Sequence, residues 1–145
     1  MNHKYFLTCL PFVLMSSLFG HAQHHSQEKK AEPPLTFVPV LSQLLSDPEL
    51  AEFKLESSVM TIVPGGVDTV SHRHDCELFG YVMEGTVEIA LNHKAPVAYK
   101  SGEMFYERRN IMHTLTRNAS QKTSAKVLLI FIIKNGREGY TPAYK

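Results

Sequence analysis

The chain has 145 residues, of which 43% are hydrophobic and 20% are charged. This length and composition fit one globular domain with a modest core and give no sign of a second domain. The formal net charge at pH 7 is +1. Without a basic excess the chain lacks the electrostatic attraction that nucleic-acid binding requires, so nucleic acid is not an expected partner.

Residues 1–22 have the pattern of a secretion signal peptide. Lys4 and the amino terminus supply positive charge, residues 5–19 are almost uninterruptedly apolar, and Gly20 and Ala22 are small residues at a cleavable step. We expect cleavage before Gln23 and an exported protein, periplasmic or secreted. An uncleaved anchor helix is the alternative, but the apolar run is shorter than the roughly 20 residues that span a bilayer. No stable membrane span is therefore expected after processing.

Export also changes the charge and the cysteine content of the protein. Removal of Lys4 leaves 14 basic and 14 acidic side chains, and removal of Cys9 leaves Cys76 alone. An internal disulfide is then excluded, even in a compartment that permits one. Stability must come from the core and from any bound metal.

Residues 23–34 are polar, end in two prolines and have no apolar period, which is typical of a flexible leader. His24 and His25 could bind metal there. A histidine pair without fixed geometry makes a weak site, so we expect solvated linker residues instead. The folded domain is expected to cover residues 35–145.

The first apolar residues of this domain recur at helical spacing. Val40, Leu41, Leu44 and Leu45 precede a break at residues 46–48, which read Ser-Asp-Pro. This spacing predicts one short N-terminal helix or turn that covers one end of the domain.

From residue 53 onward the pattern is that of short strands separated by turns, which predicts an all-β domain. Residues 78–83 are apolar on both faces, as in a strand at the centre of a sandwich, and residues 127–133 suit a buried central position. His93 falls in a turn, so we expect it to be exposed. Residues 135–145 predict coil or a clasp at the domain edge. Further strands are expected at residues 53–63, 86–91, 97–99, 104–106 and 113–116.

Three histidines carry the chemistry that the sequence suggests. His72 and His74 are two residues apart, a spacing that puts both on one face of a strand. Three neutral imidazoles can hold a metal and leave positions open for water or substrate. His113, which follows Gly102 after ten residues, is the candidate third ligand. The alternative is a set of buried histidines that are satisfied by hydrogen bonds.

The two histidine segments resemble the two motifs of the cupin family. Gly66 with His72 and His74 matches the first motif, and Gly102 with His113 matches the second. The resemblance covers roughly residues 59–133 and implies a small double-stranded β-helix, or jelly-roll barrel, that holds a divalent metal between its strands. In the second motif Asn110 stands where the family has glycine, and asparagine tolerates the left-handed conformation.

The fourth ligand is where this sequence departs from the family. The family's glutamate, four residues after the second histidine, is replaced by Leu78, and Glu77 lies one step before it. Glu77 is a candidate fourth ligand if the chain shifts by one residue at the corner formed by residues 75–77. Cys76 could be a soft ligand, although a passive, partly buried thiol fits it better.

Two residues near the second motif are the candidates for catalysis. Tyr106 and Glu107 could transfer protons or bind a substrate by hydrogen bonds, and otherwise they line the barrel. The sequence does not distinguish iron, manganese, nickel, copper and zinc as the metal, because imidazole is a suitable ligand for several of them.

Two functions follow from these observations. The first, implied by the resemblance, is a metal-dependent enzyme of dioxygenase, isomerase or lyase type that acts on a small organic molecule. The second is a binding module that captures a metal or a small ligand without turnover. A small molecule is the expected partner in both, and a homodimer is an open alternative to the monomer.

Overall fold

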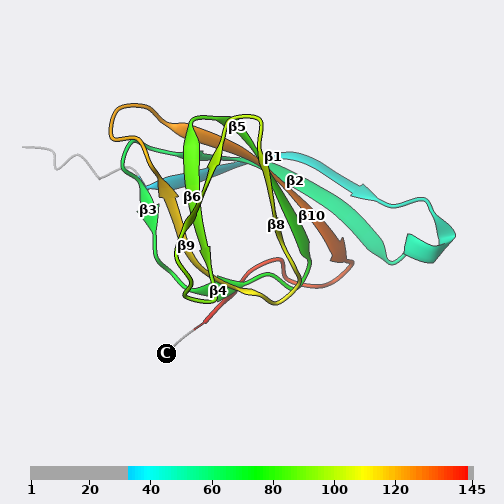
Figure 1. Cartoon of the computed structure of the whole chain (residues 1–145). Coiled ribbons are helices and arrows are strands. Elements are labelled where there is room, and N and C mark those ends of the chain that lie inside the picture. Colours follow the sequence, from blue (N-terminus) through cyan, green and yellow to red (C-terminus); the bar gives the residue numbers. More distant parts are fainter. Residues whose placement is uncertain (1–32, 144–145) are drawn as a thin grey trace, which may run out of the picture. The chain divides into compact units, whose positions relative to one another are not determined.

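The computed structural model describes residues 33–143 and shows an all-β domain of two antiparallel sheets (Figure 1). This confirms the predicted fold class. The predicted signal segment and the leader up to residue 32, with His24 and His25, lie outside the described residues. Within the described part of the chain, no helix is long and apolar enough to cross a membrane.

The first sheet has five strands and contains the longest strands of the domain. Its order is β1 (Leu35–Leu44), β2 (Phe53–Ile62), β10 (Ala125–Lys134), β5 (Glu77–Glu84) and β8 (Met104–Glu107). The second sheet is built from shorter strands. Its order is β11 (Thr141–Pro142), β4 (His72–Arg73), β9 (Met112–Asn118), β6 (Thr86–Leu91) and β7 (Val97–Lys100), and β3 (Val67–Asp68) also pairs with β9.

The predicted N-terminal helix is wrong. Residues 35–44 form β1, which pairs with β2 along its length, and only a 3-10 helix at Pro48–Leu50 follows. A bulge between Pro39 and Leu41 inserts one residue into the strand. The bulge breaks the two-residue alternation, so the local apolar spacing resembles that of a helix. Pro39 has no backbone N–H to donate, which suits the edge position of this strand.

The core lies between the two sheets. Alternate residues of β10, including Val127, Leu129 and Ile133, are buried, and β10 sits between β2 and β5 as the apolar run at 127–133 predicted. On β5 the inner residues Leu78 and Val82 are buried. The outer residues of β5, such as Tyr81 and Met83, are largely exposed, so the prediction of a strand covered on both faces was only half right.

One glycine is required by the packing of the core. A Cβ atom added to Gly80 would lie 2.0 Å from Cζ of Phe105, its partner in the β5–β8 ladder. The Phe105 ring therefore covers the backbone of β5 directly, which only glycine allows. This contact sets one wall of the interior.

Two turn predictions are confirmed. Asn110 has φ 60°, the left-handed conformation that was expected at the turn before His113. His93 has φ 58° and is exposed in the turn between β6 and β7. Neither position therefore needs glycine, because short polar side chains adopt this conformation more readily than others.

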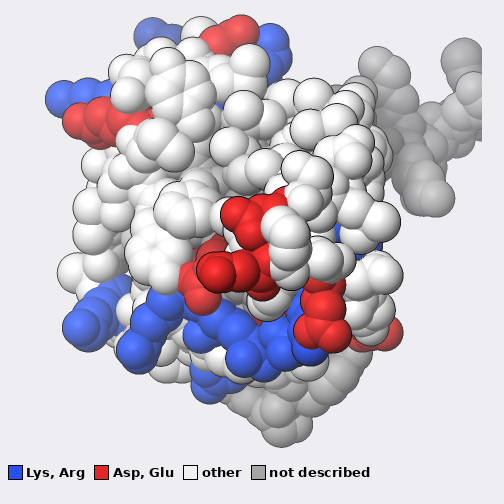
Figure 2. Space-filling model, turned by 90° about the vertical axis from the view of Figure 1, so that its right-hand side faces the viewer, with Lys and Arg blue, Asp and Glu red and all other residues white. Residues whose placement is uncertain are grey.

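Charges of both signs are mixed on the face that Figure 2 shows. Acidic and basic side chains lie next to one another there, and much of the face carries no charge. Ion pairs such as Lys54–Glu56, at 2.6 Å, and Lys126–Glu84, at 3.0 Å, join opposite charges of the described residues.

Candidate metal centre

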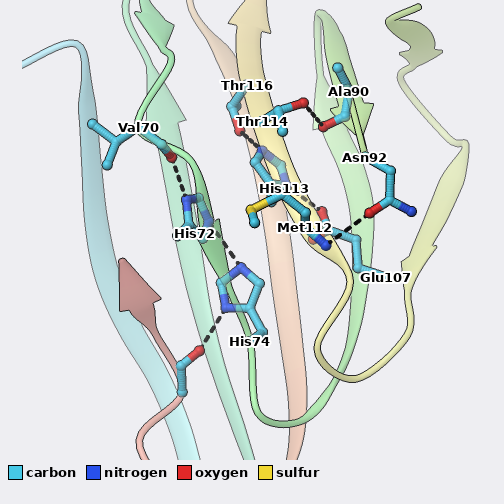
Figure 3. Close-up of polar contacts among 11 residues, drawn as sticks. Val70, His72, His74, Ala90, Asn92, Glu107, Met112, His113, Thr114 and Thr116 are labelled. Carbon is cyan, nitrogen blue, oxygen red and sulfur yellow. Dashed lines mark hydrogen bonds and ion pairs between the residues drawn. The ribbon is translucent and has the colours of Figure 1, made fainter. Parts of the chain in front are cut away.

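The fold brings the three predicted histidines together. His72 on β4 is the direct ladder partner of His113 on β9, and His74 follows β4 immediately (Figure 3). The centre of the His72 ring lies 4.7 Å from that of the His113 ring and 4.8 Å from that of the His74 ring. All three side chains are buried. Antiparallel pairing of β4 with β9 therefore joins the two sequence motifs in one cluster.

The motif loops are also tied to each other outside the cluster. The backbone N–H of Asn110 donates to the carbonyl oxygen of His74 at 2.8 Å, and the Arg73 guanidinium donates to the carbonyl oxygen of Asn110. An ion pair joins Asp75 to Arg109, whose guanidinium beside it lowers the pKa of the Asp75 carboxyl. These contacts hold the corner after His74 against the turn before His113.

His72 and His74 have the geometry of a ligand pair. Nδ1 of His72 lies 2.7 Å from the carbonyl oxygen of Val70, and Nδ1 of His74 lies 2.6 Å from that of Gly139. A neutral imidazole carries one N–H, so donation to these carbonyls leaves a lone pair on each Nε2. The two Nε2 atoms are 3.2 Å apart. Two facing lone pairs repel each other unless a proton or a metal ion lies between them.

Burial keeps these two histidines neutral. It is the largest cause that lowers the pKa of both His72 and His74 below the ordinary value of 6.5, and the carbonyl bonds offset it only in part. Neutral imidazole is the form that coordinates metals. Anchoring of the remote N–H on a carbonyl is also the usual support of a metal-bound histidine.

His113 is engaged at both nitrogens. Its Nδ1 lies 2.9 Å from Oε1 of Glu107, and its Nε2 lies 2.7 Å from the hydroxyl of Thr116. No three His, Cys, Asp or Glu side chains of residues 33–143 have donor atoms in place to share one ion. Because Glu107 accepts the Nδ1–H, Nε2 of His113 keeps its lone pair and accepts from Thr116. Rotation of the Thr116 hydroxyl would leave this lone pair available, so the fit of a metal here rests on the donor chemistry of the three imidazoles.

Glu107 is the carboxylate that enters this cluster. It is 2% exposed and lies opposite Leu78 in the β5–β8 ladder, with both side chains inside the barrel. Its Oε1 contacts His113, whereas its Oε2 has no hydrogen-bond partner within the described part of the chain.

Glu77 and Tyr106 lie on the other face of the same two strands. The Tyr106 hydroxyl donates to Oε2 of Glu77, a bond that raises the pKa of Tyr106, and the Tyr106 ring stacks on Phe79 at 5.1 Å. Tyr106 is 52% exposed. The structure therefore does not bring Glu77 or Tyr106 to the histidines, and position 78 is the one that faces inward.

Cys76 is buried but does not line the cavity at the histidines. Burial, with a smaller contribution from the neighbouring carboxylates, raises the pKa of its thiol to about 11. A thiol with this pKa stays protonated at neutral pH and is a poor metal ligand.

The C-terminal segment contributes residues that the sequence did not mark as functional. Besides the Gly139 carbonyl, the Tyr140 ring lies 4.5 Å from that of His72, and β11 pairs with β4. Of the two predictions for residues 135–145, the clasp therefore fits the described part, residues 135–143, better than coil. The contact of Thr116 with His113 was not predicted either. The one indication in the sequence was that Thr116 lies three residues after His113 in the same expected strand.

A cavity of about 460 Å³ opens onto the histidines. Most of its wall is apolar, and no lysine or arginine of the described chain lines it. The apolar lining residues are Leu35, Phe37, Met60, Leu78, Ile89, Phe105, Leu129 and Phe131. Such a cavity can enclose a small organic molecule with its polar end at the histidines.

Comparison with known proteins agrees with this fold. The family profile described as a cupin domain matches residues 58–131. No curated protein matches the chain significantly.

Similar solved structures are distant in sequence. A protein with a double-stranded β-helix domain from Klebsiella pneumoniae has 16% identity and a TM-score of 0.61, with 79% of this chain and 89% of that chain covered. The Cnp3 cupin domain of Schizosaccharomyces pombe has 15% identity and a TM-score of 0.55, with coverage of 69% and 65%. Oxalate oxidase in complex with glycolate has 18% identity and a TM-score of 0.57, with coverage of 77% and 56%. The chain thus spans less than two thirds of the length of the last two proteins. At these low identities the similarity concerns the fold alone.

Proposed function

Because the chain belongs to the cupin family, we propose that it holds one divalent transition metal with His72, His74 and His113. The observation that carries this proposal is the 3.2 Å approach of the His72 and His74 Nε2 atoms, each on a ring whose Nδ1 is anchored to a carbonyl. Iron, manganese, nickel, copper and zinc all accept imidazole ligands. When bound, such a metal supplies a Lewis acid to a ligand atom that reaches it.

Metal content of the purified protein tests this proposal. Elemental analysis should find about one transition metal per chain, and His72→Ala, His74→Ala and His113→Ala should each reduce the occupancy sharply while the barrel stays folded. His93→Ala, at an exposed turn, is the matched control and should keep the metal. Full occupancy in His113→Ala would contradict the assignment.

The cavity favours a small neutral ligand of mainly apolar character. The side chains of Glu56, Asp68 and Glu107 line it, and no cationic side chain of residues 33–143 does so. An anionic ligand would meet these carboxylates, whereas an uncharged ring or chain would bury apolar surface against Leu78 and Phe131. The glycolate of the similar oxalate oxidase is therefore a poor guide to the ligand of this protein.

A matched pair of ligands tests the charge preference. Phenol and benzoate have the same ring, but only benzoate is an anion at pH 7. Calorimetric titration of the metal-loaded protein should show tighter binding of phenols than of the corresponding carboxylates. A preference for the carboxylates would contradict this ligand class.

The reaction we propose is of dioxygenase, isomerase or lyase type on such a molecule. Capture without turnover is the second candidate, and it is favoured by one observation. Among residues 33–143, Glu107 is the only buried titratable side chain at the cavity apart from the histidines. Oxygen uptake and product analysis with neutral phenolic and dicarbonyl compounds distinguish the two. Binding without any product would favour the binding module. Product formation that is lost in His74→Ala would show that the protein is a metal-dependent enzyme.

We also propose that the protein acts outside the cytoplasm after removal of residues 1–22. The support is the charged start, the apolar run and the small residues before Gln23. Mass spectrometry of protein recovered from producing cells should find Gln23 at the amino terminus. An intact Met1 on soluble cytoplasmic protein would contradict export.

A further inference from the structure

Glu107 is a buried carboxylate that is only half satisfied. Its side chain is 2% exposed, Oε1 accepts from Nδ1 of His113 at 2.9 Å, and Oε2 has no hydrogen-bond partner in the part of the chain that the structure describes. Burial of an ionised carboxylate is costly unless the charge is paired or coordinates a metal. We therefore expect a positive group next to Oε2.

The described surroundings of Glu107 offer no such group to Oε2, because the one basic contact, Nδ1 of His113, is with Oε1. Its ladder partner is Leu78, and the cavity that it lines contains no lysine or arginine of residues 33–143. The other charged side chains that line this cavity, Glu56 and Asp68, are acidic. A cation in the cavity would satisfy the free oxygen.

The ladder register shows where this carboxylate stands. Leu78 and Glu107 are paired residues on β5 and β8, and both point into the barrel. Side chains of directly paired strand residues have Cβ atoms about 4.5–5.5 Å apart, so they reach the same space. A carboxylate at position 107 therefore occupies from β8 the region that one at position 78 would occupy from β5.

We propose that Glu107 is the carboxylate of the metal site, entering from β8 because position 78 on β5 is leucine. Its Oε1 orients His113 by holding the Nδ1–H, and its Oε2 offsets the charge of the ion. This inference rests on the proposed three-histidine site and adds a fourth, anionic group to it. It also assigns to Glu107 a role in holding the metal rather than a role as barrel lining.

Exchange of the two paired side chains tests the proposal. Competition with a chromophoric chelator gives the affinities of the full chain for Mn²⁺ and Zn²⁺. Glu107→Gln keeps the shape of the side chain and an acceptor for His113 but removes the charge. Loss of a carboxylate that only supports a ligand typically weakens metal affinity about 10–100-fold, so this variant should lose at least that much. Glu107→Leu should weaken binding as much or more. The double variant Leu78→Glu/Glu107→Leu returns a carboxylate to the same space and should recover most of the affinity.

Controls separate a metal role from a structural one. Glu77→Gln removes a carboxylate from the outer face of β5 and should leave the affinity unchanged. Thermal unfolding of the metal-free protein provides the second readout. Glu107→Gln keeps an acceptor for the Nδ1–H of His113 and removes only the carboxylate, so it should leave the metal-free protein at least as stable as the wild type. A structural role of the carboxylate instead predicts a lower melting temperature.

Each result decides between the two proposals. Equal affinity of the wild type and Glu107→Gln, with metal still lost in His74→Ala, overturns the role of Glu107 and leaves the three-histidine site intact. Failure of the double variant to bind more tightly than Glu107→Leu overturns the equivalence of the two positions. Retention of the metal in His74→Ala overturns the three-histidine site itself.

Discussion

The carbonyl oxygen of Gly139 lies 2.6 Å from Nδ1 of His74, although the two residues are 65 positions apart in the chain. The C-terminal segment thus sets the tautomer and the ring orientation of a histidine in the first motif. Support of this kind is commonly worth 10–100-fold in metal affinity.

We therefore expect removal of residues 139–145 to weaken metal binding by about 10–100-fold, because Nδ1 of His74 loses its acceptor and β4 loses its β11 partner. Chelator competition measures this. Removal of residues 144–145 alone, which spares Gly139 and β11, is the matched control. Unchanged affinity in the longer deletion would show that the carbonyl does not support the site.

The stability of the metal-free protein should depend on pH through His72 and His74. Burial lowers the pKa of both below the ordinary 6.5, so between the two values the unfolded chain binds protons that the folded chain does not. The free energy of unfolding therefore rises with pH in this range, and it declines as the pH falls below about 6.5, where the unfolded chain takes up protons. Urea unfolding at pH 8, 7, 6 and 5 should show this decline.

The double variant His72→Gln/His74→Gln should flatten that decline, because glutamine does not titrate. His93→Gln, at the exposed turn, should retain the wild-type pH dependence. A wild-type stability that stays constant from pH 7 to pH 5 would contradict the lowered pKa values.

Cys76 should be unreactive in the folded protein. With a pKa of about 11, about one thiol in a thousand is ionised at pH 8, and the side chain is buried as well. In a Cys9→Ser background, a chromogenic disulfide reagent should react with Cys76 slowly in native protein and fast in urea. A cysteine placed at the exposed position of Lys94 gives the reference rate, and equal native rates at both positions would refute the inert thiol.

Gly80→Ala should destabilise the domain. The new methyl group would lie 2.0 Å from Phe105 Cζ, and overpacking of this kind costs about 1–3 kcal/mol of unfolding free energy. Denaturant unfolding measures the loss. Addition of Phe105→Leu should relieve the clash and recover part of the stability, and a near-neutral Gly80→Ala would show that the ring moves aside without cost.

Much of the fold could be predicted because its signals are local. A continuous apolar run indicated β10, alternation indicated the inner face of β5, and Asn110 was expected to tolerate the left-handed conformation that it adopts. β1 could not be predicted this way, because the bulge between Pro39 and Leu41 shifts the alternation and only pairing with β2 makes this segment a strand.

The sequence by itself determined which histidines meet, since His72, His74 and His113 stand at spacings that a two-sheet barrel brings together. Only the tertiary structure decided which carboxylate joins them. A shift of one residue turns a strand side chain from one face to the other, so the register of β5 with β8 and β10 puts Leu78 and Glu107 inside and leaves Glu77 outside with Tyr106. Thr116 and the Gly139 carbonyl reach the histidines through contacts that exist only once the sheets have formed.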